Sequence, residues 1–418
     1  MKKEFPYVSN SWQKDLDAAK AVGIKFSADN KTLIKCPKNI SEVIIPSCVT
    51  RIGERAFYDC KNLTSVNIPN SVTTIGNSAF KSCSGLTSVT IPNGVTTIGE
   101  SAFAYCSLKS ITIPNSVTTI GDWVFFSCFC LTSVTLPDSI TTISGGMFYQ
   151  CLGLTNVTIP DSITTIKWRA FEGCSSLASI TLPNSVTTIG AGAFEYCSGL
   201  TSLTIPNSVT TIGGRAFDGV ITVAENHPVF MVDKAGALFD VNKGIMINLP
   251  KNYQGHYTIP DGVTTIGESA FYDCKNLKSV TLPNSVTRIG REAFANCSSL
   301  TSVNIPNGVT QIDGSAFSRC SSLTSVTIPN SVTTIGWYAF TQCSSLKSVN
   351  IPDSITTIRD CSFSYCSSLK NVTIPNSVTT IYGNAFYECS SLKSVSISRK
   401  TKYEKSSFPK GCQITVRD

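Results

Sequence analysis

The chain has 418 residues, of which 42% are hydrophobic and only 15% are charged, and its formal net charge is +7. This composition supplies ample core material and excludes a disordered chain, which needs low hydrophobicity and high charge. Basic residues are scattered along the chain, so we expect no basic surface that binds the phosphates of a nucleic acid. No long apolar stretch occurs, and polar residues from Glu4 to Gln13 interrupt any signal-peptide core, so we expect neither a membrane span nor an export signal.

The first predicted element is a short helix over residues 11–22. Trp12, Leu16, Ala19 and Val22 fall on one helical face, and Gly23 follows as a stop signal. Because the open end of a repeat array needs to be covered, we predict that residues 1–39 form an N-terminal cap consisting of this helix and a hairpin.

Prolines then mark a regular period. They recur every 23 residues, with one spacing of 22, and they define two blocks of modules over residues 40–217 and 259–397. Fourteen modules share one formula, and the prolines that open it are Pro46, Pro69, Pro92, Pro114, Pro137, Pro160, Pro183, Pro206, Pro260, Pro283, Pro306, Pro329, Pro352 and Pro375. A fixed period of this length predicts a stack of identical structural units.

One module, residues 323–343, shows what each unit does. Leu323, Val326 and Ile328 have the spacing of a strand with one buried face, and Pro329 ends that strand because it cannot donate to a ladder. A second extended stretch follows, and Phe340 is predicted to fill the core from a short helical turn. A single module cannot bury its apolar face, so the modules must stack.

Residues 218–258 interrupt the period. They alternate apolar and polar residues around turn signals, which predicts a β-hairpin insertion. The stretch from Gly236 to Pro250 resembles the stretch from Gly23 to Pro37, and both precede a run of repeats. We interpret both as the same initiating unit. Residues 398–418 are interpreted as a degenerate repeat and C-terminal cap.

Eighteen cysteines are present, and fourteen of them occupy the same position of the module. Side chains on stacked coils lie about 4.8 Å apart and point the same way, which disfavours disulfides between them. The chain contains no C-x-x-C pair, the spacing that would indicate a zinc site. Val220 stands at the same position in one module, so we predict a column of buried free thiols, which suits a reducing compartment.

The strand formula followed by I-P-x-S-V-T-x-I-G-x-x-A-F-x-x-C resembles the BspA-type (Treponema-type) leucine-rich repeat over residues 40–412. It departs from the commoner leucine-rich repeat because Ser71 and Gly94 stand where that repeat has an Asn. The resemblance implies a β-rich α/β solenoid, a right-handed superhelix of about fourteen 23-residue coils with parallel strands and short helical turns. It also implies a surface protein that acts in adhesion or binds host proteins.

No residue pattern indicates catalysis. The only two histidines, His227 and His256, lie in the insertion without partners at ligand spacing, and we interpret them as surface or turn residues. Nucleotide-binding, metalloprotease and hydrolase motifs are absent, and acidic residues occur singly. We therefore expect no enzyme activity, no cofactor and no metal site.

Two surfaces are candidates for binding. Exposed strand positions carry hydroxyl pairs such as Ser110 and Thr112, which favour strand solubility and could alternatively bind glycans or ice. The positions that flank the core Phe vary between modules and carry aromatic residues, the usual anchors of protein contacts. We predict a partner-binding ridge formed by Trp123, Phe126, Tyr149, Trp168, Tyr196, Trp337, Tyr338, Tyr365, Tyr382 and Tyr387.

The favoured function is a non-catalytic, monomeric protein-binding module, with a host or extracellular-matrix protein as its partner by resemblance. An intracellular scaffold is the alternative that the missing export signal and the free thiols favour. A glycan-binding or ice-binding hydroxyl ladder is a third. The cell surface and the cytoplasm both stay open as locations.

Overall fold

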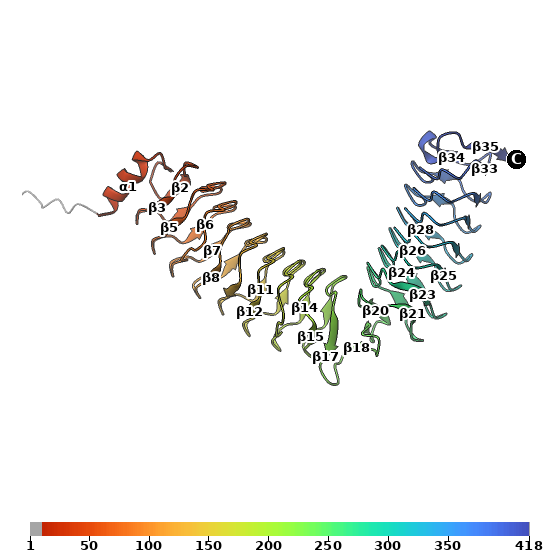
Figure 1. The fold of residues 1–418 in the computed structure, drawn as a ribbon, viewed down its shortest axis with the longest axis horizontal. Coiled ribbons are helices and arrows are strands. Elements are labelled where there is room, and N and C mark those ends of the chain that lie inside the picture. Colours follow the sequence, from red (N-terminus) through yellow and green to blue (C-terminus); the bar gives the residue numbers. More distant parts are fainter. Residues whose placement is uncertain (1–10, 418) are drawn as a thin grey trace, which may run out of the picture. The chain divides into compact units, whose positions relative to one another are not determined.

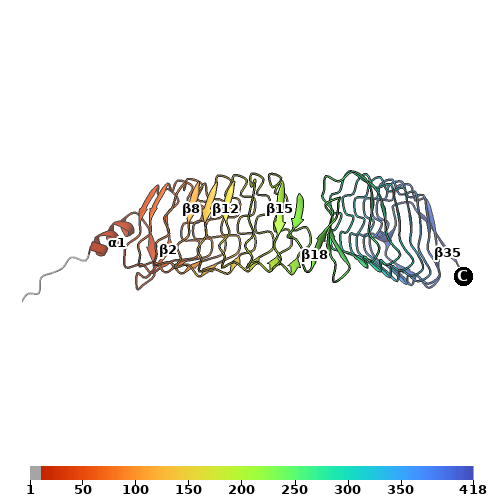
Figure 2. The ribbon, with the colours of Figure 1, turned by 90° about the horizontal axis from the view of Figure 1, so that it is seen from below.

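The computed structural model describes residues 11–417, so the N-terminal residues used in the signal-peptide prediction lie outside it in part, as does the side chain of Val220. The chain divides into two compact units, Met1–Asp218 and Gly219–Asp418, here called unit 1 and unit 2. In each unit, coils of the chain stack one on another and build two ladders of short parallel strands (Figures 1 and 2).

The first ladder is formed mostly by strands that directly precede a module proline. In unit 1 it contains β3 (Glu42–Ile44), β5 (Ser65–Asn67), β8 (Ser110–Thr112), β10 (Ser133–Thr135), β12 (Asn156–Thr158) and β15 (Ser202–Ile205). In unit 2 it contains β21 (Gly255–Thr258), β23 (Leu277–Thr281), β25 (Ser302–Asn304), β27 (Ser325–Thr327), β29 (Ser348–Asn350), β31 (Asn371–Thr373), β33 (Ser394–Ser398) and β35 (Gln413–Arg417).

The second ladder is formed mostly by the two-residue strand, usually Thr-Ile, that follows the proline turn. Its strands in unit 1 are β2 (Thr32–Lys35), β4 (Arg51–Ile52), β6 (Thr74–Ile75), β7 (Thr97–Ile98), β9 (Thr119–Ile120), β11 (Thr142–Ile143), β13 (Thr165–Ile166), β14 (Thr188–Ile189) and β16 (Thr211–Ile212). Its strands in unit 2 are β20 (Ile245–Asn248), β22 (Thr265–Ile266), β24 (Arg288–Ile289), β26 (Gln311–Ile312), β28 (Thr334–Ile335), β30 (Thr357–Ile358), β32 (Thr380–Ile381) and β34 (Lys402–Tyr403).

These nine and eight second-ladder strands make seventeen turns within residues 11–417, so the predicted solenoid is confirmed with slightly more turns than the fourteen that the prolines mark. The extra turns belong to the initiating and closing segments. The remaining elements are α1 (Ser11–Ala21), β1 (Lys25–Phe26), β17 (Val220–Val223), β18 (Phe230–Val232), β19 (Leu238–Asp240) and a single 3₁₀ turn, η1 (Lys405–Ser407).

A column of stacked phenylalanine rings runs through the core of each unit, and Phe340 fills the core as predicted. From Phe57 to Phe217 in unit 1, neighbouring ring centroids lie 4.7–6.0 Å apart with interplanar angles of at most 21°. From Phe271 to Phe408 in unit 2, the separations are 4.6–5.5 Å. Each ring packs on the same ring of the next coil, because the coil spacing is close to a stacking distance.

The segment that carries the core Phe is not helical, and the prediction of short helical turns is wrong. In the coil of Phe340, Tyr338 and Gln342 both take a left-handed φ of 58°, which a right-handed helix excludes. Alternate N–H groups bond within the coil and to the next coil: Ala339 N–H donates to Gly336 O, whereas Phe340 N–H donates to Ser362 O. This third side of each coil, here called the turn side, is therefore also linked from coil to coil.

The column of cysteines is confirmed. Thirteen of the fourteen ladder cysteines are buried and Cys412 is half-buried, and none of the eighteen cysteines forms a disulfide. The position is not merely a small apolar one, because the thiol also donates a weak hydrogen bond. In eleven coils the Sγ atom lies 3.0–3.2 Å from the carbonyl oxygen of the core Phe of the preceding coil, as Cys343 does to Phe317. Burial raises the pKa of Cys174 and of Cys320 well above the usual range.

Hydroxyl groups take the place of the Asn of the commoner repeat. Ser71 Oγ donates to Val49 O at 2.7 Å, and the equivalent serine repeats this bond on other coils. Gly94 stands at the same position without a side chain, and a Cβ there would collide with the carbonyl of Asn70. A carbonyl group of each such proline turn thus accepts a hydrogen bond from the coil that follows it.

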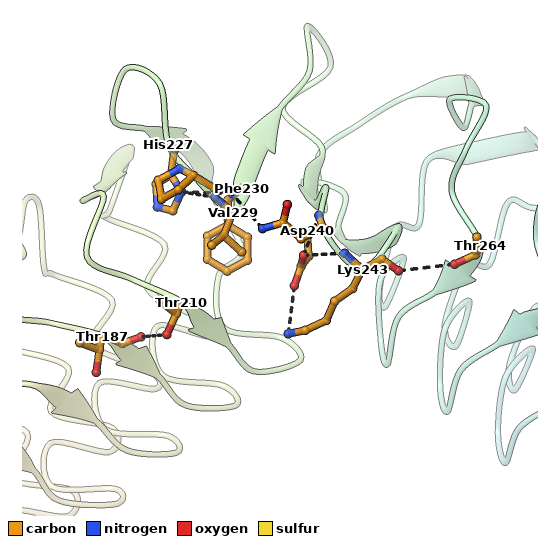
Figure 3. A network of polar contacts seen from close by, with 10 residues as sticks. Thr187, Thr210, His227, Val229, Phe230, Asp240, Lys243 and Thr264 are labelled. Carbon is orange, nitrogen blue, oxygen red and sulfur yellow. Dashed lines mark hydrogen bonds and ion pairs between the residues drawn. The ribbon is translucent and has the colours of Figure 1, made fainter.

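A short antiparallel hairpin precedes the repeats of each unit. Strand β1 pairs with β2 in unit 1, and β19 pairs with β20 in unit 2, before β2 and β20 each join the parallel second ladder. Gly23 and Gly236 both have a positive φ and both lie against a proline ring, that of Pro37 and that of Pro250. In unit 2, the Asp240 carboxylate accepts from the turn that follows β19 and pairs with Lys243 at 3.2 Å (Figure 3).

The helix predicted over residues 11–22 is α1, which ends at Ala21. Leu16 and Ala19 are buried. Val22 does not belong to this buried face and is 57% exposed, because the helix has already ended before it.

Candidate partner-binding surfaces

Five aromatic residues of unit 1 pack together on the turn side. Tyr105 meets Phe126 at 4.8 Å between ring centroids, and Trp123 contacts Phe126, Tyr149 and Trp168 at 5.4, 5.4 and 4.9 Å. Phe126 and Tyr149 are 5.2 Å apart. We call this set the aromatic cluster. It brings together four of the ten predicted site residues and adds Tyr105, which the sequence prediction missed.

Two glycines make the space for the indole rings of the aromatic cluster. A Cβ on Gly145 would lie 2.6 Å from the Trp168 ring, and a Cβ on Gly146 would collide with the Trp123 ring. Gly146 also has a positive φ of 58°. Both indoles therefore lie directly on the backbone of the coil of Phe148. This arrangement holds Trp168 in place although 39% of its surface is exposed.

A column of carboxylates continues the aromatic cluster along the solenoid. The residues that follow the core Phe on successive coils are Phe126, Tyr149, Glu172, Glu195 and Asp218. Glu172 and Glu195 are buried. The pKa of Glu172 is raised to about 7, chiefly by burial, with Arg169 and Arg215 opposing the rise and the negative charges of Glu195 and Asp218 adding to it. The Arg169 guanidinium lies 3.4 Å from the Glu172 carboxylate.

Two further apolar side chains of unit 1 lie exposed on the coils of the aromatic cluster. Phe129 and Leu152 directly follow ladder cysteines and are 51% and 43% exposed. Most modules have Ser at this position, so the departure from Ser was a signal in the sequence that the prediction did not use. Tyr196, the fifth predicted site residue of unit 1, is exposed on a later coil and does not belong to the cluster.

The predicted aromatic residues of unit 2 are more dispersed. Trp337, Tyr338, Tyr365, Tyr382 and Tyr387 are all exposed. The Tyr365 and Tyr387 rings meet edge to face at 5.6 Å, and the Arg359 guanidinium lies 5.0 Å above the Trp337 ring. Aromatic residues of the two units thus form one compact cluster in unit 1 and separate contacts in unit 2.

The strand face carries the exposed hydroxyls that the sequence predicts, as in β10, where Ser133 and Thr135 flank a buried valine. His256 lies on this face in unit 2, and its Nδ1 and Nε2 atoms lie 2.8 and 3.1 Å from the hydroxyls of Ser279 and Thr258. His227 is a turn residue whose ring accepts from the Val229 and Phe230 N–H groups (Figure 3).

Over residues 11–417, no helix is long and apolar enough to cross a membrane. Within the same range, His, Cys, Asp and Glu side chains do not come together in threes in a way that could hold a metal ion.

Stacked coils with two parallel ladders and a variable turn side define a leucine-rich repeat solenoid, a class that in general serves as protein-interaction modules. A family model described as the BspA-type leucine rich repeat region matches residues 29–107, 96–224, 253–367 and 310–416 in six copies. The chain belongs to the BspA-type leucine-rich repeat family.

Solved bacterial structures resemble the chain over most of its length. A leucine rich cell surface protein from Faecalibacterium prausnitzii is 32% identical, with a TM-score of 0.57, and the match covers 92% of this chain and 94% of that one. A leucine-rich repeat protein from Eubacterium ventriosum is 25% identical, with a TM-score of 0.56 and coverages of 93% and 90%. One from Bacteroides ovatus is 30% identical, with a TM-score of 0.45 and coverages of 94% and 90%. No protein with a curated description matches the sequence.

Proposed function

We propose that this chain is a non-catalytic, adhesin-like surface module that docks a host or partner protein on the aromatic cluster of unit 1. The observation that carries the proposal is the packing of Trp123 and Trp168 against the glycine backbone at residues 145–146. Indole rings that are already held in place lose little entropy on binding, which favours their use as anchors. Tryptophan and tyrosine are also the residues that most often dominate protein interfaces.

The surroundings of the aromatic cluster support a protein partner. Exposed Phe129 and Leu152 extend its apolar surface, and the Arg169–Glu172 pair provides charge beside it. An apolar centre bordered by polar groups is the usual anatomy of a protein interface. The cell-surface description of the relative from Faecalibacterium prausnitzii supports a surface location.

The test uses the full chain and purified extracellular-matrix proteins, each immobilised singly. A Trp123→Ser/Trp168→Ser double variant removes both anchors, and Trp337→Ser in unit 2 is the matched control, because Trp337 is exposed and lies outside the cluster. We expect the double variant to lose at least about thirtyfold in affinity, the effect of one interface hot spot.

Biolayer interferometry measures the affinities, and circular dichroism checks that both variants keep the wild-type spectrum. A matrix protein that binds the double variant as tightly as the wild type does not use the cluster, and that result contradicts the proposal. Absence of binding to every matrix protein contradicts the host-protein part of it.

A further inference from the structure

Unit 2 carries an open groove on its turn side, lined by polar and charged side chains and one tyrosine, with a volume of about 540 Å³. Its floor crosses successive coils along the column of residues that precede the ladder cysteines, namely Asp273, Asn296, Arg319, Gln342 and Tyr365. Serines that follow those cysteines line it as well. From this lining we infer that the groove binds an oligosaccharide that carries a carboxylate group. This inference does not rest on the proposed function, because it concerns the other unit and other residues.

The backbone arranges the groove side chains in a regular row. Asn296, Arg319 and Gln342 all have a left-handed φ, of 64°, 61° and 58°. Each donates its N–H to a carbonyl of the next coil at 2.8 Å. Because the same backbone geometry repeats, the three side chains leave their coils in the same way, at intervals of about 4.8 Å. The row is thus held in place by main-chain bonds and needs none of its side-chain polar groups for its own stability.

The charge of the groove favours an anionic ligand. Asp273 at one end is paired with Lys275 at 3.1 Å, so these two charges offset each other. Arg319 in the middle is exposed and has no ion pair with any residue in 11–417. A guanidinium presents a planar set of donors that matches a carboxylate in two parallel bonds. The groove therefore has one uncompensated positive charge at its centre.

The groups beside Arg319 fit the hydroxyls of a sugar. Asn296 and Gln342 lie one coil to either side, and within residues 11–417 their amides form no side-chain hydrogen bond. An amide offers both donors and an acceptor, as a sugar hydroxyl does. Ser321 and Ser344 donate to carbonyls of preceding coils at 3.4 and 3.3 Å, which leaves their oxygens as acceptors.

Tyr365 closes the row with an aromatic face. The side chain is 48% exposed, and its ring is held edge to face against Tyr387. Such a ring offers an apolar surface to the C–H face of a sugar and a hydroxyl at its rim. The lining contains no aliphatic side chain, whereas peptide ligands depend on apolar anchors seated in pockets. The volume lies in the range of small-molecule sites, so a short oligosaccharide is the ligand that fits best.

Isothermal titration calorimetry on the full chain tests the inference with two acidic probes, 3′-sialyllactose and tetragalacturonate, which distinguish a sialic acid from a hexuronic acid. Lactose is the neutral control. We expect at least one acidic probe to bind, and Arg319→Gln to weaken it roughly tenfold, the effect of one charge-assisted hydrogen bond. Tyr365→Phe should bind as the wild type does, and Tyr365→Ala several-fold more weakly, because the ring face makes the contact.

The matched control is Arg291→Gln, which removes an exposed arginine of the same unit outside the groove and should leave the affinity unchanged. The inference is overturned if neither acidic probe binds at millimolar concentration, if lactose binds as tightly as sialyllactose and tetragalacturonate, or if Arg319→Gln binds as the wild type does. It is also overturned if an acidic tetrapeptide binds in an Arg319-dependent way while both acidic sugars do not. None of these results depends on the aromatic cluster of unit 1.

Discussion

Units 1 and 2 share a core and differ on the turn side. Both have the same hairpin ahead of their repeats, stack one phenylalanine per coil and bond most of their buried ladder thiols to a phenylalanine carbonyl. Following the core Phe, five successive coils of unit 1 have Phe126, Tyr149, Glu172, Glu195 and Asp218, whereas three successive coils of unit 2 have Ser318, Thr341 and Ser364. Core side chains that meet their own counterparts are constrained by the coils above and below, whereas the turn-side position after the core Phe, buried at Glu172 and at Thr341, has different chemistry in the two units.

Removal of a core ring should have the greatest effect on stability, and it tests whether the two units have equivalent cores. Phe148→Ala in unit 1 and Phe317→Ala in unit 2 each remove a ring stacked on both sides, so each should lower the free energy of unfolding by about 3–5 kcal/mol. Solenoid stability comes from neighbouring coils, so the loss of hydrogen-exchange protection should be concentrated in the unit that carries the change.

Hydrogen exchange followed by mass spectrometry and denaturant unfolding measure both quantities. Phe129→Ala, which removes an exposed ring of unit 1, should change the free energy of unfolding by less than about 0.5 kcal/mol. If one core variant loses stability and the other does not, the two cores are not equivalent.

The second prediction concerns the pH dependence of the free energy of unfolding, to which Glu172 of unit 1 contributes. The pKa of Glu172 is raised from 4.5 to about 7 in the folded protein, so the folded state binds this proton more tightly than the unfolded state. This group therefore lowers the free energy of unfolding progressively as the pH rises from about 4.5 to about 7. Glu172→Gln should remove that decline and stabilise the chain at pH 8 by at most about 3 kcal/mol, with loss of the Arg169 pair reducing the gain.

Urea unfolding of the full chain at a series of pH values checks this expectation. Glu100→Gln, an exposed carboxylate of the same unit, serves as control and should leave the pH profile as it is. A Glu172→Gln profile that is parallel to the wild-type profile from pH 4 to 8 would show that the burial of Glu172 does not perturb its titration.

Alanine substitutions of turn-side glycines should have the smallest effects on stability, and these effects should differ between the two units. Gly146→Ala places a Cβ into the Trp123 ring at a positive φ, so it should cost about 1–2 kcal/mol and shift the tryptophan emission. Gly314→Ala in unit 2 meets only the Trp337 carbonyl oxygen at 3.4 Å and should be close to neutral. Fluorescence spectra and unfolding curves of the two variants provide the comparison. Equal and small effects would mean that the indoles of the cluster are not held by the glycine backbone.

Much of the fold could be predicted because every core residue meets its own counterpart one coil away. The proline period, the role of Phe340 and the burial of Cys343 all followed from one module repeated. The helical turn was predicted wrongly for the same reason: a single module does not show that alternate N–H groups of the turn side bond to the next coil. Those bonds require the left-handed backbone found at Tyr338 and Gln342.

The candidate site was only partly predictable. Its aromatic residues could be identified one by one, because they break a nearly uniform pattern, but their grouping could not. Tyr105 joins the cluster through a ring on the next coil, and Gly145 matters only because Trp168 lies against it. In unit 2, Arg319 is one of many scattered basic residues in the sequence, and its position in a groove comes from the alignment of five coils.

The solenoid, its period, its core phenylalanines and its buried thiols follow from the amino-acid sequence, since they depend on contacts that repeat with the motif. Which turn-side side chains meet one another follows only from the folded structure. Those contacts between coils join residues 21 to 45 positions apart, between side chains that follow no repeat, so no pattern within one module encodes them. That is why one repeat architecture carries an aromatic cluster in unit 1 and a polar groove in unit 2.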